Sequence, residues 1–167
     1  SASSVVADRG DGTALLIRYL VFAALGFIGL NIAARFPLKR LLALTGPLLA
    51  IAFVLLIAVK IPGIGVSVNG ARRWIGFGEL QFQPSELAKL ALVLYTARFL
   101  AERPRGFKRS GELLPLALVV GGAILLVVTQ PDLGTALVAG FTCAAMLVAA
   151  GIKLRWLAGY AGAAGVL

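Results

Sequence analysis

The sequence is poor in the residues that soluble enzymes most often use for chemistry. It contains no histidine, which removes the commonest general base and metal ligand, and it has a single cysteine, Cys143. One cysteine alone forms neither an intrachain disulfide nor a cysteine-rich metal site. Charged residues make up 14% of the 167 residues, whereas a soluble domain has about a quarter. These shortages fit the membrane class better than a soluble domain.

Long hydrophobic runs take the place of the missing charge. Hydrophobic residues make up 60% of the chain, and its mean hydropathy is +0.96. Residues 41–59 and 113–130 carry no charged side chain at all. A helix needs about 20 apolar residues to cross the hydrocarbon core of a bilayer, and each of these runs approaches that length. The sequence therefore predicts a membrane protein.

The apolar blocks predict an all-α fold, a polytopic bundle of transmembrane helices within a single membrane domain over residues 1–167. The five predicted spans cover approximately residues 13–34, 41–59, 84–100, 113–130 and 133–152. A sixth apolar stretch, 156–167, forms a helix of only about 18 Å, which is too short to cross a bilayer. We therefore expect the chain to be truncated at both ends.

Lysine and arginine residues indicate the orientation of the spans. Most of the 16 basic residues fall in short clusters between spans, at 35–40, 98–109 and 153–155. The positive-inside rule assigns these clusters to the cytoplasm, so segment 60–83 and the turn 130–132 are expected to face outward. Because the positive charge is divided among loops, topology explains the net charge of +9 better than nucleic-acid binding does.

Three ionisable residues lie in or beside predicted spans, namely Glu86, Lys89 and Asp132. Charges at such depth normally face the bundle interior or water, because exposure to lipid is costly. We hypothesise that Lys89 pairs with Asp132, with Glu86 nearby, in an outward-facing polar cavity. A purely structural salt bridge, or shallow residues that reach the interface, are alternative interpretations. Asp132 also lies between Pro131 and Thr135 in a position to cap the next helix.

The outward segment carries an adjacent arginine pair, Arg72 and Arg73. Guanidinium groups match phosphate oxygens geometrically, so the pair is a candidate site for an anionic head group. Contact with ordinary lipid phosphates, or hydrogen bonds to loop carbonyls, are the alternatives. Trp74 is expected to anchor the segment at the interface, and Pro84 is suited to the first turn of the next helix.

Three short motifs resemble signatures of the SEDS family, which includes FtsW, RodA and SpoVE. They read NGARRWI at 69–75, FQPSELAK at 82–89 and QPDLGTA at 130–136. Besides the charged residues already named, the supporting motif positions are Asn69, Gly70, Trp74, Gln83, Pro84, Ser85, Gln130, Pro131, Gly134 and Thr135. The resemblance covers essentially the whole chain.

The resemblance implies a ten-helix glycosyltransferase that polymerises lipid II, the undecaprenyl-pyrophosphate-linked precursor, on the outer face of the bacterial cytoplasmic membrane. A class B penicillin-binding protein is the implied partner. The spans would correspond to helices two to six. Glu86, Lys89 and Asp132 match cavity positions of the family, and Arg72 matches its outer-loop basic position.

The family's presumed catalytic aspartate follows the seventh helix, so no catalytic residue is expected in this chain and the chain alone should be inactive. No cofactor or metal-ligand cluster is identifiable, although a divalent metal remains possible in a full-length enzyme. The opening stretch SASSVVA at 1–7 and the loop stretch GVSVNGARRW at 65–74 resemble the division branch, FtsW, more than the elongation branch, RodA. A lipid II flippase and a non-catalytic scaffold for the penicillin-binding protein are the alternative functions.

Overall fold

The computed structural model describes residues 12–68, 71–77 and 80–165. The chain divides into two compact units, Ser1–Leu41 and Leu42–Leu167. The described part of the first unit consists of helix α2 (Gly12–Ala34) and the start of helix α3 (Leu38–Ala58). The remaining elements belong to the second unit, which contains all of the predicted site residues that the structure describes.

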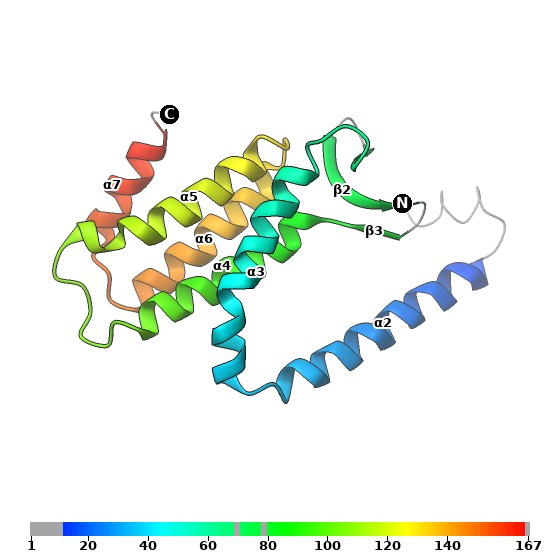
Figure 1. The fold of residues 1–167 in the computed structure, drawn as a ribbon, viewed down its shortest axis with the longest axis horizontal. Helices are drawn as coiled ribbons and strands as arrows, with labels where there is room; N and C mark the ends of the chain where they lie inside the picture. The colour runs from blue at the N-terminus through cyan, green and yellow to red at the C-terminus, as the bar shows by residue number, and fades with distance from the viewer. Residues whose placement is uncertain (1–11, 69–70, 78–79, 166–167) are drawn as a thin grey trace. The chain divides into compact units, whose positions relative to one another are not determined.

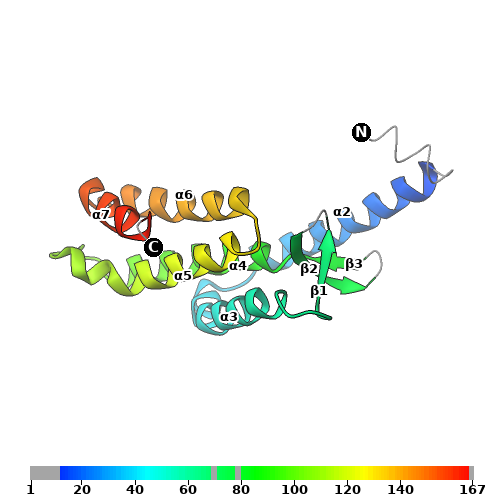
Figure 2. The same cartoon turned by 90° about the horizontal axis from the view of Figure 1, so that it is seen from above.

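The second unit is a helical bundle with a small antiparallel sheet at one end (Figures 1 and 2). After α3 come strands β1 (Gly65–Val68), β2 (Ala71–Phe77) and β3 (Leu80–Phe82), then helix α4 (Pro84–Ala101) and a 3₁₀ turn, η1 (Ser110–Leu113). Helices α5 (Leu114–Val128), α6 (Leu133–Ala149) and α7 (Leu154–Gly165) complete it. Helix α7 lies at the end of the bundle opposite the sheet (Figures 1 and 2).

The helices of the second unit pack through small side chains. One buried cluster joins α3, α4, α5 and α6, and its alanines are Ala52, Ala88, Ala91 and Ala136. Small residues let helix backbones approach closely, which favours helix association in membranes, where the lipid is as apolar as the helix surface. The bundle therefore holds α4 and α6 side by side, and both carry predicted site residues.

Helices of the structure coincide with the predicted ranges, with small differences at their ends. The span expected at 84–100 is α4, and the one expected at 133–152 is α6, which ends earlier, at Ala149. The span expected at 113–130 begins with η1 and ends as a helix at Val128. By length and hydropathy, Leu38–Ala58 and Ser110–Val128 suffice to cross a membrane.

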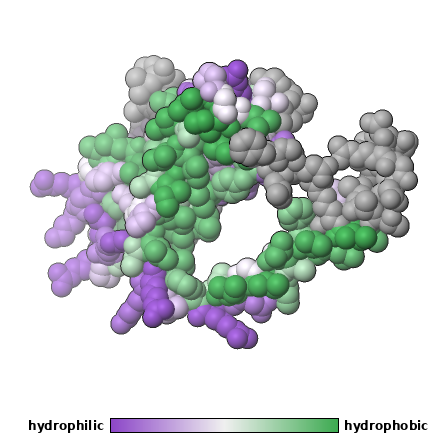
Figure 3. Space-filling model, turned by 45° about the vertical axis from the view of Figure 1, so that its right-hand side comes forward, coloured by the Kyte–Doolittle hydropathy of each residue, from purple (hydrophilic) through white to green (hydrophobic). Residues whose placement is uncertain are grey.

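The outer surface of the helices is apolar. Large hydrophobic side chains that are exposed in the second unit include Val54, Leu90, Leu118, Leu137 and Phe141. Figure 3 shows this hydrophobic surface over the helices, with hydrophilic side chains gathered beyond it. An exposed surface of this kind is expected for helices that contact lipid rather than water.

The sequence analysis expected segment 60–83 to face outward and predicted no sheet there. Strand β2 pairs with β1 on one side and β3 on the other, all antiparallel, with an irregularity between Val66 and Ser67. The segment ends at Gln83, whose extended backbone precedes Pro84, the first residue of α4. Strand β3 and Gln83 thus connect the strand that carries the arginine pair to the start of α4.

Gly65, the first residue of β1, allows the sheet to approach the end of α3. A Cβ atom built on Gly65 would lie 1.9 Å from the carbonyl oxygen of Val59, a distance that no side chain tolerates. Glycine is therefore required at this position by the close approach of two backbone segments. The turn that places β1 against the bundle depends on it.

We expect Gly65→Ala to destabilise the full-length protein that carries this chain by about 1–3 kcal/mol, because β1 must move away from Val59. Thermal unfolding in detergent measures the effect. Gly121→Ala in α5 is the matched control, since no atom lies within 4 Å of a Cβ built there. Equal midpoints for the two variants would contradict the packing argument.

Candidate functional site

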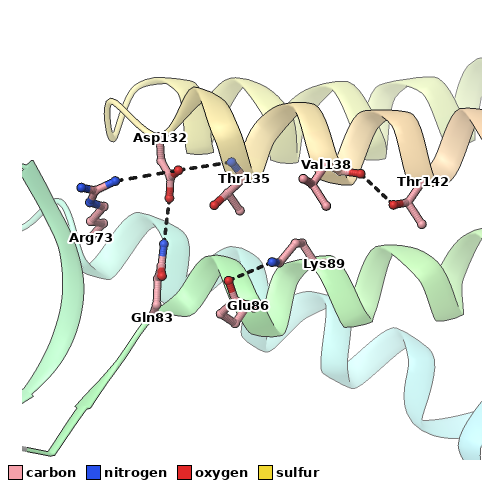
Figure 4. A network of polar contacts seen from close by, with 8 residues as sticks. All are labelled: Arg73, Gln83, Glu86, Lys89, Asp132, Thr135, Val138 and Thr142. Carbon is pink, nitrogen blue, oxygen red and sulfur yellow. Dashed lines mark hydrogen bonds and ion pairs between the residues drawn. The ribbon is translucent and has the colours of Figure 1, made fainter. Parts of the chain in front are cut away.

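Asp132 is the centre of a polar network at the sheet end of the bundle (Figure 4). Its side chain caps α6 by accepting a hydrogen bond from the backbone N–H of Thr135, with Oδ1 at 3.2 Å. Its Oδ2 accepts a shorter bond, 2.7 Å, from Nε2 of Gln83 at the start of α4. Asp132 is only 8% exposed, so these partners replace water around its charge. The capping role that the sequence left open is confirmed.

Arg73 approaches the same carboxylate from β2. Its Nη1 lies 3.8 Å from Oδ1 of Asp132, which is ion-pair distance but too long for a hydrogen bond. The Gln83 bond is much shorter and is charge-assisted, so it contributes more to holding Asp132 than the arginine does. Among the described residues, Asp132 is the ion-pair partner of Arg73, and this long contact leaves the Nη donors of Arg73 for another anion, whereas its Nε is buried.

The turn between α5 and α6 is also tied to the end of α3. Gln130 is buried, and its Nε2 donates a 2.9 Å hydrogen bond to the carbonyl oxygen of Leu56, in the last turn of α3. Lys60, just beyond α3, donates from Nζ to Oγ1 of Thr129 at 3.0 Å. The carbonyls of a last helical turn lack partners within the helix, so Gln130 supplies a missing donor. The motif residues Gln130 and Asp132 thus satisfy two different helix ends.

Lys89 does not pair with Asp132, which corrects our expectation. Among the described residues, its ion pair is with Glu86, one turn earlier on α4, at 2.8 Å. A separation of three residues puts the two side chains on the same face of the helix, so the local pair forms without help from α6. Figure 4 shows Lys89 and Glu86 joined on α4, while Asp132 is joined to Gln83, Arg73 and Thr135.

The remaining motif positions divide between buried and exposed. Pro84 and Ser85 are buried in the first turn of α4, and Trp74 is partly buried on β2, opposite Val66. Exposed positions are Arg72, Pro131 and Gly134. Asn69 and Gly70 lie outside the described residues. The structure therefore gathers Arg73, Gln83, Gln130, Asp132 and Thr135 around one turn, with Ser85 and the Glu86–Lys89 pair on the adjoining turns of α4.

Three buried polar atoms of this region have no hydrogen-bond partner among the described residues. They are Nε of Arg73, Oγ of Ser85 and Oε1 of Gln130. Buried polar atoms in proteins are almost always hydrogen-bonded to protein, water or ligand. All three belong to β2, the start of α4 and the α5–α6 turn, so the unmet hydrogen-bonding capacity is concentrated at the candidate site.

Sequence reasoning missed Lys60 and Thr129, which fasten the turn to α3. Lys60 is the first residue of the outward segment 60–83, and the sequence analysis gave it no role. Its position directly after an apolar helix, where a cation near the helix C-terminus is favourable, was the available signal. Nothing in the sequence indicated that Thr129 was its partner, because the two are far apart in the chain.

The arrangement suits binding better than proton transfer. Both oxygens of Asp132 already accept hydrogen bonds, so this carboxylate is poorly placed to abstract a proton from a substrate. In the described part of the chain, no three His, Cys, Asp or Glu side chains gather as metal ligands. The site instead offers arginine donors beside a half-exposed lysine–glutamate pair.

The fold and the site define a polytopic helical membrane protein with a polar site at one end of its bundle. The sequence model of the cell cycle protein family FtsW/RodA/SpoVE matches residues 1–167. The chain belongs to this family, the SEDS family of membrane proteins.

The chain is similar to proteins from several bacteria. It is 39% identical over 160 residues to the probable peptidoglycan glycosyltransferase FtsW of Coxiella burnetii, covering 92% of this chain and 42% of that protein. It is 37% identical over 159 residues to the stage V sporulation protein E of Bacillus subtilis, covering 92% and 43%. The chain thus spans about two fifths of the length of these relatives.

Solved structures agree with the helical fold. The crystal structure of the rod shape determining protein RodA of Thermus thermophilus has a TM-score of 0.73 and 35% identity, covering 96% of this chain and 52% of RodA. A chain of a peptidoglycan synthase complex has a TM-score of 0.69 and 34% identity, covering 92% of this chain and 45% of that one. The expected all-α membrane bundle is confirmed.

We predict that Asp132→Ala destabilises the full-length protein by about 1–3 kcal/mol, because it removes the α6 cap and leaves the Gln83 amide without its acceptor. Asp132→Asn should lose less, since an amide oxygen still caps the helix. Thermal unfolding measures both variants. Glu102→Ala is the control, because Glu102 forms an exposed pair with Arg98 and such pairs contribute at most about 1 kcal/mol. A loss for Asp132→Ala no greater than that for Glu102→Ala would contradict this role.

Proposed function

We propose that the protein carrying this chain is a peptidoglycan glycosyltransferase that polymerises lipid II into glycan strands during cell division. The observation that supports this most directly is the similarity to probable peptidoglycan glycosyltransferases named FtsW across 92% or more of this chain. The polar site at the sheet end supplies what such a substrate needs, a group of cations beside an apolar helix surface. Lipid II presents a pyrophosphate and a long hydrocarbon chain.

In this proposal, Arg72 and Arg73 bind the pyrophosphate of the substrate. Arg72 is exposed on β2, and the ion pair of Arg73 with Asp132, its partner among the described residues, is long enough to leave Nη donors for a phosphate. Planar guanidinium groups bind phosphate oxygens through paired hydrogen bonds. We also propose that Glu86 and Lys89 line a polar cavity beside the arginines, because a half-exposed ion pair on a membrane helix requires a wet surrounding.

The chemical step forms a bond between the acceptor sugar oxygen and the anomeric carbon of the donor sugar. The bond from that carbon to the pyrophosphate breaks, and undecaprenyl pyrophosphate leaves as an anion that the arginines stabilise. The proton of the acceptor hydroxyl passes to a carboxylate that we propose lies outside this chain, in a part of the protein beyond the region matched here. A divalent metal in the full-length enzyme remains part of the proposal only as a further counter-charge.

Location and partner follow from the same proposal. The sheet end faces outward from the bacterial cytoplasmic membrane, because most basic residues of the second unit lie in or beside its α4–α5 and α6–α7 connections. The partner is a class B penicillin-binding protein, and a related chain belongs to a peptidoglycan synthase complex. The division branch is favoured over the elongation branch because several similar relatives are named FtsW.

We expect the full-length protein in liposomes to convert added lipid II into glycan strands, detected by gel electrophoresis of the polymer. Replacing the outer-loop aspartate of the full-length protein should abolish the product. Movement of lipid II across the bilayer without polymer would instead support a flippase. Binding to the penicillin-binding protein with neither activity would support a scaffold, and either result would overturn the polymerase proposal.

We further expect Lys89→Ala to lower the polymerisation rate at least about tenfold, because it leaves Glu86 as an uncompensated charge in the cavity. Lys89→Arg should retain more activity, since it preserves the cation. The same polymerisation assay is read beside thermal unfolding, so that a loss of fold is distinguished. Lys39→Ala, an exposed lysine at the start of α3, is the control. Normal rates for Lys89→Ala would remove this pair from the site.

A further inference from the structure

The end of the bundle opposite the sheet is built from the α4–α5 and α6–α7 connections packed together. Phe99, Leu113 and Ile152 are buried there, and Phe107 and Trp156 pack against them. The hydroxyl of Tyr160 on α7 donates a 2.8 Å hydrogen bond to the carbonyl oxygen of Ser110. These contacts join the two connections into one surface.

Arg103 braces the α4–α5 connection from within. Its guanidinium lies 3.8 Å from the centre of the Phe99 ring and 5.8 Å from that of Phe107, and the two rings are stacked. Its Nη1 also donates a 3.0 Å hydrogen bond to the carbonyl oxygen of Phe99. An arginine stacked on aromatic rings is held in place by them. We therefore assign Arg103 to stabilising the α4–α5 connection and not to binding an external partner. These contacts give the α4–α5 connection a fixed conformation.

Five further cations project from this surface, and we call them the basic platform. They are Arg105, Lys108, Arg109, Lys153 and Arg155, and all five are exposed. None of them forms an ion pair with an acidic residue of the described part of the chain, where Glu102 pairs with Arg98. Figure 3 shows hydrophilic side chains projecting at this end of the bundle, directly beyond the hydrophobic helix surface. Glu102 and Glu112 lie in the same α4–α5 connection, so the five cations leave an excess of positive charge on this surface.

The surroundings of the basic platform indicate which kind of molecule it binds. The platform borders the apolar helix surface, where Leu118 and Val148 are exposed, so it lies at the depth of lipid head groups when the helices cross a membrane. Trp156 is partly buried beside Lys153, whose Nζ lies 5.8 Å from its ring, a pairing typical of membrane interfaces. Cations directly beside lipid-facing helices lie within reach of the lipid phosphate groups, so membrane lipids are favoured over a soluble protein as the partner.

We propose that the basic platform binds the head groups of anionic phospholipids, such as phosphatidylglycerol, at the membrane surface opposite the candidate site. The arginines supply paired donors for the phosphate, and the lysines add positive charge. Because the platform includes both the α4–α5 and α6–α7 connections, a bound lipid bridges them and holds the base of α7 against α4. This binding site is separate from the sheet end and does not depend on the polymerase activity.

The test titrates short-chain phosphatidylglycerol and phosphatidylcholine into the detergent-solubilised full-length protein, with native mass spectrometry giving an apparent Kd for each lipid. We expect phosphatidylglycerol to bind at least about tenfold more tightly, since each cation near an anionic surface contributes a several-fold preference. The triple variant Arg105→Gln, Lys108→Gln, Arg109→Gln should lose most of that preference.

Two controls make the result specific to the platform. The double variant Lys39→Gln, Arg40→Gln removes exposed positive charge elsewhere and should keep the preference for phosphatidylglycerol. The variant Arg105→Lys, Arg109→Lys keeps the charge and should retain most of it, while thermal unfolding confirms that every variant is folded. An unchanged preference in the folded triple variant, or an equal loss in the Lys39/Arg40 control, would overturn the proposal.

Discussion

The polar end of this bundle depends on the carboxylate of Asp132, which bonds the first turn of α6 to the start of α4. Helix ends expose backbone N–H and C=O groups that lipid cannot satisfy, so a membrane bundle needs internal partners at every turn. Asp132 accepts from Thr135 at the beginning of α6, and Gln130 donates to Leu56 at the end of α3. One short turn thereby completes two helices, while the Gln83 bond fixes where α4 begins relative to both.

The same network explains why structural and functional interpretations of the site do not compete. The short bonds of Asp132 go to Gln83 and to the backbone of Thr135, which leaves Arg73 at ion-pair distance only. A carboxylate with both oxygens engaged serves as a fixed negative charge. It orients Arg73, and in the described part of the chain neither Nε of Arg73 nor Oγ of Ser85, in the first turn of α4, has a hydrogen-bond partner. A structural anchor thus positions groups that can contact an anion.

The sequence predicted the helices well, because apolar blocks of membrane length are set by composition alone and need no knowledge of packing. The cost of charge beside such blocks singled out Glu86, Lys89 and Asp132. The family motifs added Gln83 and Gln130, and the assignment of all these residues to a functional site stays a prediction. The sequence could not identify the partners. Lys89 was assigned to Asp132 because both were expected in one cavity, yet Glu86 lies on the same helix face and reaches Lys89 at 2.8 Å. The sheet was missed as well, although Asn69-Gly70 between β-branched and aromatic residues is a recognised hairpin signal.

The local pairing of Lys89 changes the electrostatics of the site. Had Lys89 neutralised Asp132, Arg73 would have had no carboxylate and Glu86 would have remained as a free negative charge, which repels a phosphate. With Glu86 and Lys89 paired to one another, the α4 face is neutral overall. Asp132 then offsets part of the charge of Arg73, and Arg72 stays exposed on the same strand. Glu86 and Asp132 each lie close to one cation, and Arg72 adds a further positive charge. Among the described residues the sheet end therefore has a net positive charge. That distribution favours an anionic ligand at the sheet end.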